Sequence, residues 1–488
     1  MNGTTSTETT STTIVERLPA RDIDLSCRPP LMLFFGSGLI WLFVGTLFAL
    51  IAAIKLHGPG FLANIPWLTF GRIEPAAANC VVYGFGVQVS LGVLLWMMCR
   101  LGGMRLLFQP ALCVAGFLWN VALTAGIVAI LAGWSTGCEW LEMPHFSAVL
   151  MLVAYALIGV CAITNFHLRR DRALYPSQWY ILGALFWFAW IFSAAYLMLI
   201  LAPVRGAFQA VVNAWYISNL TDLWFASVGI AIIYYFVPKL LNRPLYSRPL
   251  AAFGFWTLAF FAQWLGMTRL ISGPVPAWMP SVSIAAAALM LVPLISVAMN
   301  WYLTAEGRTN VLRQIDTGRF IWFAAISYVV ATFALILMGH RSTAAVTQFT
   351  YAEVGRTALV LHGFLGMALF GALYYIVPRI TEFQWPALKH VRLHFTLYAV
   401  GVALLVFGLF AGGILQGLRM NQSTADFVAL IKSTVPFIGI STLGLLLLLA
   451  GQALALKNFF TLSHRSNAHV RAYAIDFITG RETIRRGA

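Results

Sequence analysis

Twelve apolar runs divide almost the whole chain at regular intervals, and they constrain its fold more than any other feature. They lie at 31–54, 79–101, 108–132, 146–166, 177–202, 213–237, 248–272, 279–304, 319–339, 354–377, 393–415 and 434–460. A helix rises about 1.5 Å per residue, so each run can cross the roughly 30 Å of hydrocarbon in a bilayer. Because 60% of the residues are hydrophobic and only 10% are charged, a soluble fold is excluded. We therefore predict an all-α membrane protein, a twelve-span helical bundle.

The basic residues between the runs predict the orientation of the bundle. Roughly three quarters of the 31 Lys and Arg residues fall in the two terminal segments and in the loops on their side of the membrane. Cytoplasmic loops of membrane proteins carry such an excess. Both termini are therefore predicted to be cytoplasmic. The net charge of +15 is explained by this topology, and we expect no nucleic acid partner.

The chain is predicted to have three segments. Residues 1–28 are rich in Thr and Ser and read as a mobile polar tail in the cytoplasm, residues 29–460 form the bundle, and residues 461–488 form a basic cytoplasmic tail. The six cysteines are scattered and include no C-x-x-C pair. This pattern argues against a disulfide framework, a zinc site, an iron–sulfur cluster or covalently attached haem.

Two of the runs end on a shared signature, Tyr234–Lys239 (YYFVPK) and Tyr374–Arg379 (YYIVPR). A proline stops a helix, and the cation that follows it is expected to stay at the inner interface of the membrane. Because two spans share this ending, the sequence also hints at an internally repeated bundle. His362 is the one histidine well inside a predicted span. A lone intramembrane histidine is more typical of a packed hydrogen-bonding group than of a metal ligand, since a bis-histidine haem site needs a second partner.

Four charged residues fall in the outer ends of their predicted spans. They are Asp222, Arg269, Glu353 and Arg356. Charged side chains at such depths are costly and usually face the bundle interior in pairs, although Glu353 and Arg356 could instead reach the interface. We predict that at least one of the two arginines pairs with Asp222 or Glu353.

A set of aromatic, proline and glycine motifs runs from Trp215 to Gly417. They are Trp215-Tyr216, Tyr234–Lys239, Arg243–Ser247, Phe255-Trp256, Trp264, Phe370–Arg379 and Ala411–Gly417. Together they resemble subunit I of the cbb-type cytochrome c oxidases, the C-family of the haem-copper oxidase superfamily, which is related to the nitric oxide reductases. The likeness runs from Arg28 to Leu418, and the resemblance implies the same twelve-span topology.

The resemblance also implies a set of metal ligands, namely six histidines that hold a low-spin haem, a high-spin haem and a copper ion where dioxygen is reduced. Aligned by the flanking motifs, all six positions carry other residues here. The low-spin haem positions fall at Ala77 and Ala358, the high-spin position at Arg356, the copper positions at Ser218, Thr268 and Arg269, and a cross-linked tyrosine at Ala262. His362 lies one helical turn past Ala358, out of register with these ligands.

These substitutions bear directly on the cofactors. Alanine offers no lone pair and a guanidinium stays protonated, so we expect neither haem b nor copper to bind in the family manner, and we assign no catalytic residue. Vacated haem pockets would leave voids in a close-packed interior. Aromatic side chains of the sixth, seventh and tenth spans are one candidate to fill them and the new arginines are another, and the sequence leaves open whether a lipid or quinone occupies the space.

The leading hypothesis is a subunit I homologue of a bacterial inner membrane that acts as a non-catalytic structural or regulatory subunit. Its partners would be the lipid bilayer and other respiratory subunits, such as a membrane-anchored cytochrome c. Two alternatives stay open: an active oxygen or nitric oxide reductase with unorthodox haem ligation through His362 or methionines, and a transporter or proton path that reuses the emptied cavity. An assembly or haem-delivery factor cannot be distinguished from the first hypothesis by sequence.

Overall fold

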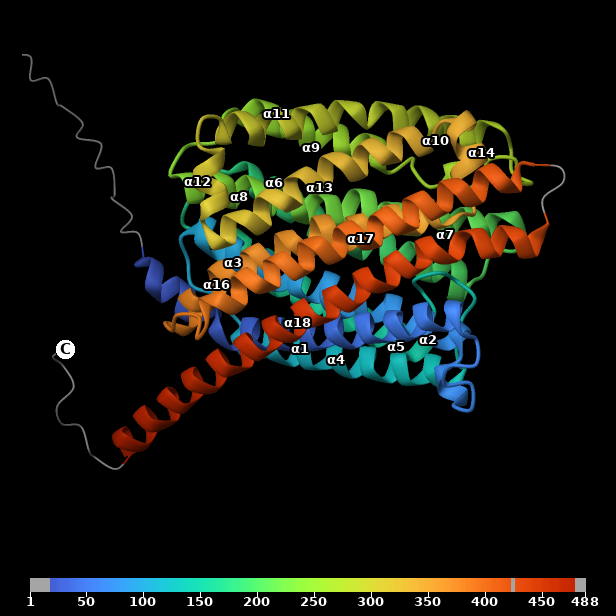
Figure 1. Cartoon of the computed structure of the whole chain (residues 1–488). Coiled ribbons are helices and arrows are strands. Elements are labelled where there is room, and N and C mark those ends of the chain that lie inside the picture. The colour runs from blue at the N-terminus through green and yellow to red at the C-terminus, as the bar shows by residue number, and fades with distance from the viewer. Residues whose placement is uncertain (1–17, 423–425, 479–488) are drawn as a thin grey trace, which may run out of the picture.

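A computed structural model describes residues 18–422 and 426–478, with side chains described through Ala468. Within these residues, twelve helical segments are long and apolar enough to cross a membrane, which confirms the predicted fold class. The segments run side by side as one bundle (Figure 1). The first described helix begins and the last ends on the same side of the bundle, at the left in Figure 1, as an even number of spans requires.

Nine of the twelve spans form the outer layer of the bundle and surround the other three. They are α1 (Ala20–His57), α4 (Gln109–Ala132), α5 (His145–His167), α6 (Pro176–Tyr196) with η3 (Leu197–Leu201), α9 (Arg248–Ala262) with η5 (Met267–Leu270), α10 (Trp278–Leu289) with α11 (Leu291–Ala305), α13 (Asp316–Met338), α17 (Leu388–Met420) and α18 (Phe427–Ile478). Short helices in the connections are η1 (Pro66–Leu68), α12 (Thr309–Gln314) and α14 (Arg341–Thr347). A helix with one apolar face against protein and another against lipid explains the partial burial of these spans.

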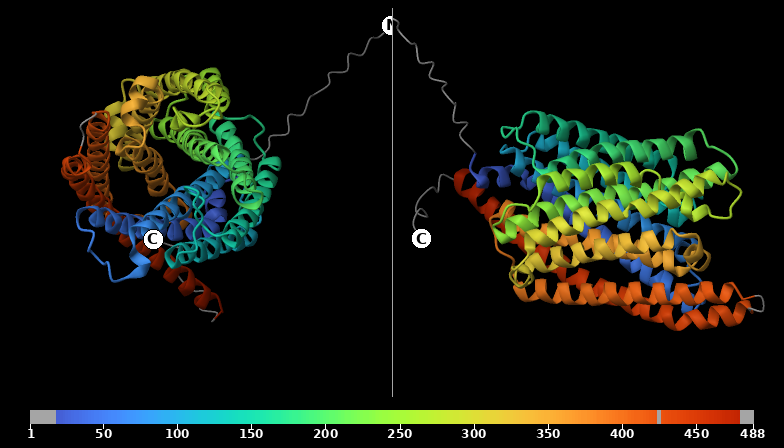
Figure 2. Two further views of the ribbon diagram at one scale, coloured as in Figure 1. Left: turned by 90° about the vertical axis from the view of Figure 1, so that its right-hand side faces the viewer. Right: turned by 90° about the horizontal axis from the view of Figure 1, so that it is seen from above.

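Three spans form the interior of the bundle, and each changes its helical winding midway. They are α2 (Phe70–Asn79), η2 (Cys80–Val87) and α3 (Gln88–Gly102); α7 (Ala207–Asn219), η4 (Leu220–Phe225) and α8 (Ala226–Leu241); and α15 (Tyr351–Ala358), η6 (Leu359–Gly366) and α16 (Met367–Thr381). Nearly every residue of their apolar stretches is buried, and η2, η4 and η6 are π-helical. Viewed along the bundle, the other helices enclose them (Figure 2). Wide turns of this kind frequently mark functional sites.

The structure moves both predicted tail boundaries. α1 already begins at Ala20, because its first turns have partners: Arg105 donates to Asp22, and Arg21 donates to Glu382. Residues 20–28 are therefore helical rather than a mobile tail, and residues 1–17 lie outside the described part of the chain. α18 continues past residue 460 to Ile478, so most of the predicted basic tail extends the last span as a helix.

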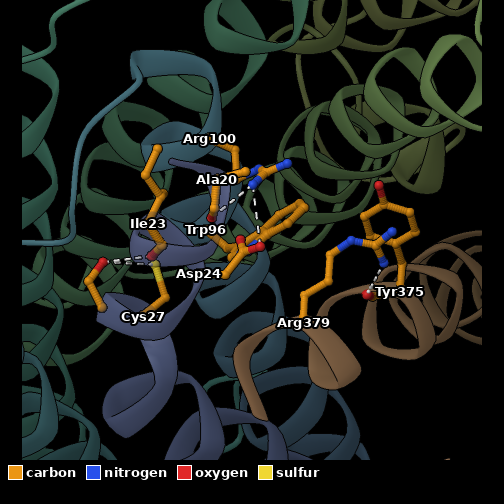
Figure 3. Close-up of polar contacts among 9 residues, drawn as sticks. Ala20, Ile23, Asp24, Cys27, Trp96, Arg100, Tyr375 and Arg379 are labelled. Atoms are coloured by element: carbon orange, nitrogen blue, oxygen red, sulfur yellow. Dashed lines mark hydrogen bonds and ion pairs between the residues drawn. The ribbon is translucent and has the colours of Figure 1, made fainter. Parts of the chain in front are cut away.

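A polar cluster closes the interior spans at the end of the bundle where the first described helix begins and the last ends, the inner end in the predicted orientation (Figure 3). Asp24 is 5% exposed and accepts hydrogen bonds from Trp96 Nε1 at 2.9 Å and from Arg100 Nη1 at 3.3 Å. Arg379 donates to the carbonyl of Tyr375 at 2.8 Å, and its guanidinium lies 3.4 Å from the centre of the Tyr375 ring. Pro378 and Pro238 both lie inside their helices, which continue to Thr381 and Leu241, so the predicted stop at the proline is wrong by about one turn. Arg379 stacks on the Tyr375 ring near this end of the span.

Candidate functional site

A buried ion pair between Arg356 and Asp222 lies in the outer half of the interior spans. Arg356 Nη1 is 2.8 Å from Asp222 Oδ1, and Nη2 is 3.2 Å from Oδ2, so the pairing is bidentate. Both side chains are 7% exposed. A charge removed from water at this depth is tolerated because the planar guanidinium meets a carboxylate that matches its geometry.

Local structure aims both side chains inward. Asp222 sits in η4, where the wider winding turns the backbone, and Thr221 Oγ1 donates to Asp222 Oδ2 at 3.1 Å. Arg356 lies in the last turn of α15, just before the winding widens again at η6. The two residues are 134 positions apart in sequence, so only the packing of two interior spans brings them together.

The other two members of the predicted charged set lie elsewhere. Arg269 lies in η5, and its nearest carboxylate is Glu139, with Arg269 Nη1 3.6 Å from Glu139 Oε2. Glu353 is half-buried, lies one turn before Arg356 on α15, and lines a cavity together with Arg269. Sequence reasoning missed Glu139, because it lies in the loop between α4 and α5, and nothing in the sequence shows that this loop folds over the end of η5.

The residues at the predicted copper positions surround very little space. Ser218 and Thr268 line a cavity of about 30 Å³ together with Arg269, Glu353 and Arg356. A second space, next to Asp222 and Phe364, measures about 10 Å³. Side chains therefore fill this part of the bundle, and the guanidinium groups of Arg269 and Arg356 lie where a metal cation would be repelled.

A much larger cavity lies beside it, and this was not expected. It measures about 710 Å³ and is lined by α1, α2, α15, η6, α17 and α18. Ala77 and Ala358 are among its wall residues, together with His362. Neither aromatic side chains nor arginines fill this part of the predicted haem region, because small residues such as Ala77 and Ala358 line it.

The size of this cavity has an energetic consequence. At about 24 cal/mol per Å³, a sealed and empty void of 710 Å³ would cost about 17 kcal/mol. That exceeds the roughly 5–15 kcal/mol by which a typical domain is stable. A sealed, empty void of this size is therefore excluded, and exposed side chains among the wall residues, such as Phe70 and Phe349, show that the cavity opens to the surroundings of the bundle.

Two buried histidines each pair with a tyrosine, but in different surroundings. His362 Nδ1 is 3.0 Å from Tyr398 Oη, and the ring lines the large cavity. His394 Nδ1 is 2.8 Å from Tyr374 Oη, and its ring packs against Phe370. The sequence places His394 at the edge of a predicted span, but the side chain is fully buried, because its ring packs between Phe320 and Phe370.

The loop between α4 and α5 covers the outer end of α2. Asn79 Nδ2 donates to Glu142 Oε2 at 2.6 Å, and Tyr83 donates to the carbonyl of Trp140. Glu142 is 8% exposed. Burial raises the pKa of Glu142 to about 7, although the hydrogen bond from Asn79 opposes the shift. This loop residue therefore titrates near neutral pH, a property that sequence alone did not predict.

The described residues fit a family metal site poorly. Among residues 18–422 and 426–478, no group of three or more His, Cys, Asp or Glu side chains is arranged to hold a metal ion. The positions Ser218, Thr268 and Arg356 supply hydroxyls and a guanidinium, and Ala77 and Ala358 supply only methyl groups. One imidazole, that of His362, reaches the large cavity. We therefore derive no reaction step through haem or copper.

The twelve-span bundle with its three buried central spans defines a membrane protein of the haem-copper oxidase subunit I type. The chain belongs to the family described as Cytochrome C and Quinol oxidase polypeptide I, whose model matches residues 30–447. Its fold is similar to that of a haem-copper terminal oxidase dimer solved by cryo-electron microscopy. The TM-score is 0.70 at 12% identity, over 90% of this chain and 84% of that one.

Curated relatives give the same family at low identity. A cytochrome c oxidase subunit 1 homolog of Azorhizobium caulinodans is 24% identical over 437 residues, covering 86% of this chain and 79% of the relative. The cbb3-type cytochrome c oxidase subunit CcoN1 of Stutzerimonas stutzeri is 25% identical over 439 residues, covering 86% of this chain and 91% of the relative. The predicted likeness to subunit I is thereby confirmed at the level of the superfamily.

Proposed function

We propose that this chain is a non-catalytic structural or regulatory member of the oxidase subunit I family, without haem and copper bound in the family manner. The observation that carries the proposal is the buried pair of Arg356 and Asp222. The resemblance predicts that Arg356 stands at the position of the family's high-spin haem ligand. A guanidinium has no lone pair to give a metal, and here its charge is already balanced by a carboxylate.

The surroundings of this pair support the same proposal. The copper positions Ser218, Thr268 and Arg269 enclose only about 30 Å³. A cupric or cuprous ion placed there would meet the positive charges of Arg269 and Arg356 at close range in a medium of low dielectric constant. The retained scaffold would then serve assembly. We place it in a bacterial cytoplasmic membrane beside other respiratory subunits, such as a membrane-anchored cytochrome c.

A haem spectrum of the protein purified with its native partners tests the proposal. We expect no reduced-minus-oxidised haem b band assigned to this chain, and a copper content far below one ion per chain. A cbb3-type subunit I purified in parallel is the positive control. Stoichiometric haem b or copper that stays with this chain after its partners are removed would refute the proposal.

One observation favours a second candidate, a reductase with unorthodox haem ligation. His362 lines the large cavity, and Tyr398 holds its Nδ1, which is how proteins commonly orient a metal-binding imidazole. The same spectrum decides between the two. If a haem band is present in the wild type and lost in H362F, this second candidate replaces the first.

A transporter or proton path is less well supported. Such a path needs a polar route from the inner to the outer end of the bundle. Between Asp24 and Asp222 the interior spans instead pack aromatic rings against one another, among them Trp96 on Phe236 and Phe85 on Phe370. The space beside Asp222 measures only about 10 Å³, which is close to the minimum for one water molecule.

A further inference from the structure

The large cavity reaches from one end of the bundle to about the middle of the membrane. Its wall residues on α15 and η6 run from Tyr351 to His362, which is about 16 Å at a rise of roughly 1.5 Å per residue. That length is about half of the roughly 30 Å of hydrocarbon in a bilayer. Measured from the end of the bundle opposite to the termini, the cavity therefore has the depth of a single lipid leaflet.

Away from this end, the walls of the cavity are mostly apolar. Small side chains such as those of Ala53, Ala77 and Ala358 line it. The last wall residue on η6 is His362, which already pairs through Nδ1 with Tyr398 Oη at 3.0 Å. This part of the cavity therefore accepts a hydrocarbon chain, because methyl and methylene groups pack together without any loss of hydrogen bonds.

The open end of the cavity carries an excess of negative charge. Three carboxylates line it, those of Glu74, Glu139 and Glu353, and we call them the carboxylate rim. Arg269 is the one Lys or Arg among the described wall residues, and its Nη1 lies 3.6 Å from Glu139 Oε2. The carboxylates of Glu74 and Glu353 form no hydrogen bond and no ion pair with any residue that the structure describes. Two carboxylates of the rim are therefore available to a ligand.

This charge selects among molecules that have a hydrocarbon chain. A fatty acid or an anionic lipid would add negative charge to the rim, and like charges repel strongly where water is scarce. A hydrocarbon without a polar head would leave Glu74 and Glu353 partly desolvated and without a partner. A head group with an ammonium meets both requirements, because its three N–H groups donate to carboxylate oxygens in charge-assisted hydrogen bonds.

Exposed apolar side chains bring the carboxylate rim into contact with the bilayer. Leu56, Phe70, Phe349 and Val354 line the cavity and are 38–76% exposed. They lie at or next to the ends of their spans, at the level where lipid head groups meet water. A lipid of the same leaflet can therefore insert a chain into the cavity and keep its head at the rim.

We propose that the cavity is a binding site for a phospholipid with a primary amine in its head group, such as a phosphatidylethanolamine. An acyl chain fills the space beside Ala77 and Ala358. The ammonium lies at the carboxylates of Glu74 and Glu353, and the phosphate faces Arg269, whose guanidinium suits a phosphate oxygen. The inference concerns a lipid held by this chain and goes beyond the proposed non-catalytic role.

Lipid binding to the purified full-length protein tests the inference. Dioleoyl-phosphatidylethanolamine or dioleoyl-phosphatidylglycerol is added to delipidated protein in detergent, and native mass spectrometry counts the lipids that stay bound. We expect one ethanolamine lipid per chain, bound about tenfold more tightly than the glycerol lipid, as one hydrogen bond between charged groups provides. The ethanolamine lipid should also raise the melting temperature, because it binds the folded state alone.

The double variant E74Q/E353Q tests the carboxylate rim. It removes two charges and keeps the size of both side chains, so we expect the two lipids to bind equally. E306Q is the matched control, because Glu306 is exposed and does not line the cavity, and it should keep the preference of the wild type. If the carboxylates were only structural, the double variant would change stability without changing the lipid preference.

A second pair of variants tests the apolar part of the cavity. A358F places a ring in it, whereas A288F places one on an exposed face of α10. We expect A358F to lose the bound lipid and A288F to keep it, with equal melting temperatures in the absence of lipid showing that both variants fold.

Three results overturn the inference: equal binding of the two lipids by the wild type, an unchanged preference in E74Q/E353Q, or equal binding by A358F and A288F. Each of them leaves the proposed function untouched, because that proposal depends on the haem spectrum. Haem recovered from this cavity would refute both.

Discussion

The buried charges of Arg356 and Asp222 are tolerated only because each side chain pairs with the other. Removing one partner leaves a buried, unpaired charge, so we expect R356M or D222N to lower the free energy of unfolding by about 3–5 kcal/mol. The double variant R356M/D222L replaces the pair by apolar groups and should recover most of this loss. Thermal unfolding in detergent measures the effect.

The exposed pair of Arg392 and Asp316 is the matched control for this prediction. Arg392 Nε lies 3.1 Å from Asp316 Oδ1, but the arginine side chain is 60% exposed. D316N should therefore change stability by less than about 1 kcal/mol. If D222N is as mild as D316N, the buried pair does not stabilise the interior.

Glu142 makes stability depend on pH. Its pKa is raised to about 7 in the folded protein, against an ordinary value near 4.5. The folded state therefore holds the proton more tightly than the unfolded state. The stabilisation is complete below about pH 4.5 and is lost as pH rises through about 7, with a total size of about 3 kcal/mol. We expect the melting temperature to fall between pH 5 and pH 8.

E142Q tests the source of this pH dependence, because an amide cannot titrate but still accepts a bond from Asn79. The variant should show a flatter profile from pH 5 to pH 8. E306Q, at an exposed position, should keep the wild-type slope. An unchanged slope in E142Q would show that another group causes the effect.

At the scale of whole elements, two glycines of α17 allow it to pack closely against α14 and the first turn of α15. A Cβ on Gly417 would collide with the carbonyl oxygen of Val346, and one on Gly413 would collide with the backbone nitrogen of Ala352. Backbone atoms cannot move aside as a flexible side chain can. We therefore expect G417A to lower stability by about 1–3 kcal/mol, measured by thermal unfolding.

Gly159 of α5 provides a control, because alanine at this position should raise stability instead of lowering it. A Cβ there would meet no atom within 4 Å, so G159A should gain about 0.5–1 kcal/mol from the higher helix propensity of alanine. Loss of stability in both variants would mean that the close approach of α17 is not the cause.

At the scale of the whole molecule, the orientation in the membrane remains a prediction. Gly137 lies in the connection after the third span and Gly307 in the connection after the eighth, so the two should face opposite sides. Alkaline phosphatase fused after Gly137 should be active and after Gly307 inactive, with the reverse for a fluorescent protein that folds only in the cytoplasm. The reverse pattern would place both termini outside.

The sequence by itself determined the number of spans, the fold class and the family. Hydrophobic length is a local property, because every backbone group in a bilayer must be satisfied within its own helix. The same local reasoning identified Asp222 and Arg356 as charged residues that need partners at depth.

Only the tertiary structure decided which partners they have and what lies beside them. Glu139 and Tyr398 became parts of the site because packing brings a loop and a distant span against the interior spans. The cavity at Ala77 and Ala358 is a property of the space between six elements, which depends on every side chain facing it. Volume between elements cannot be read from any one segment, and for that reason the sequence alone did not decide what occupies the space beside Ala77 and Ala358.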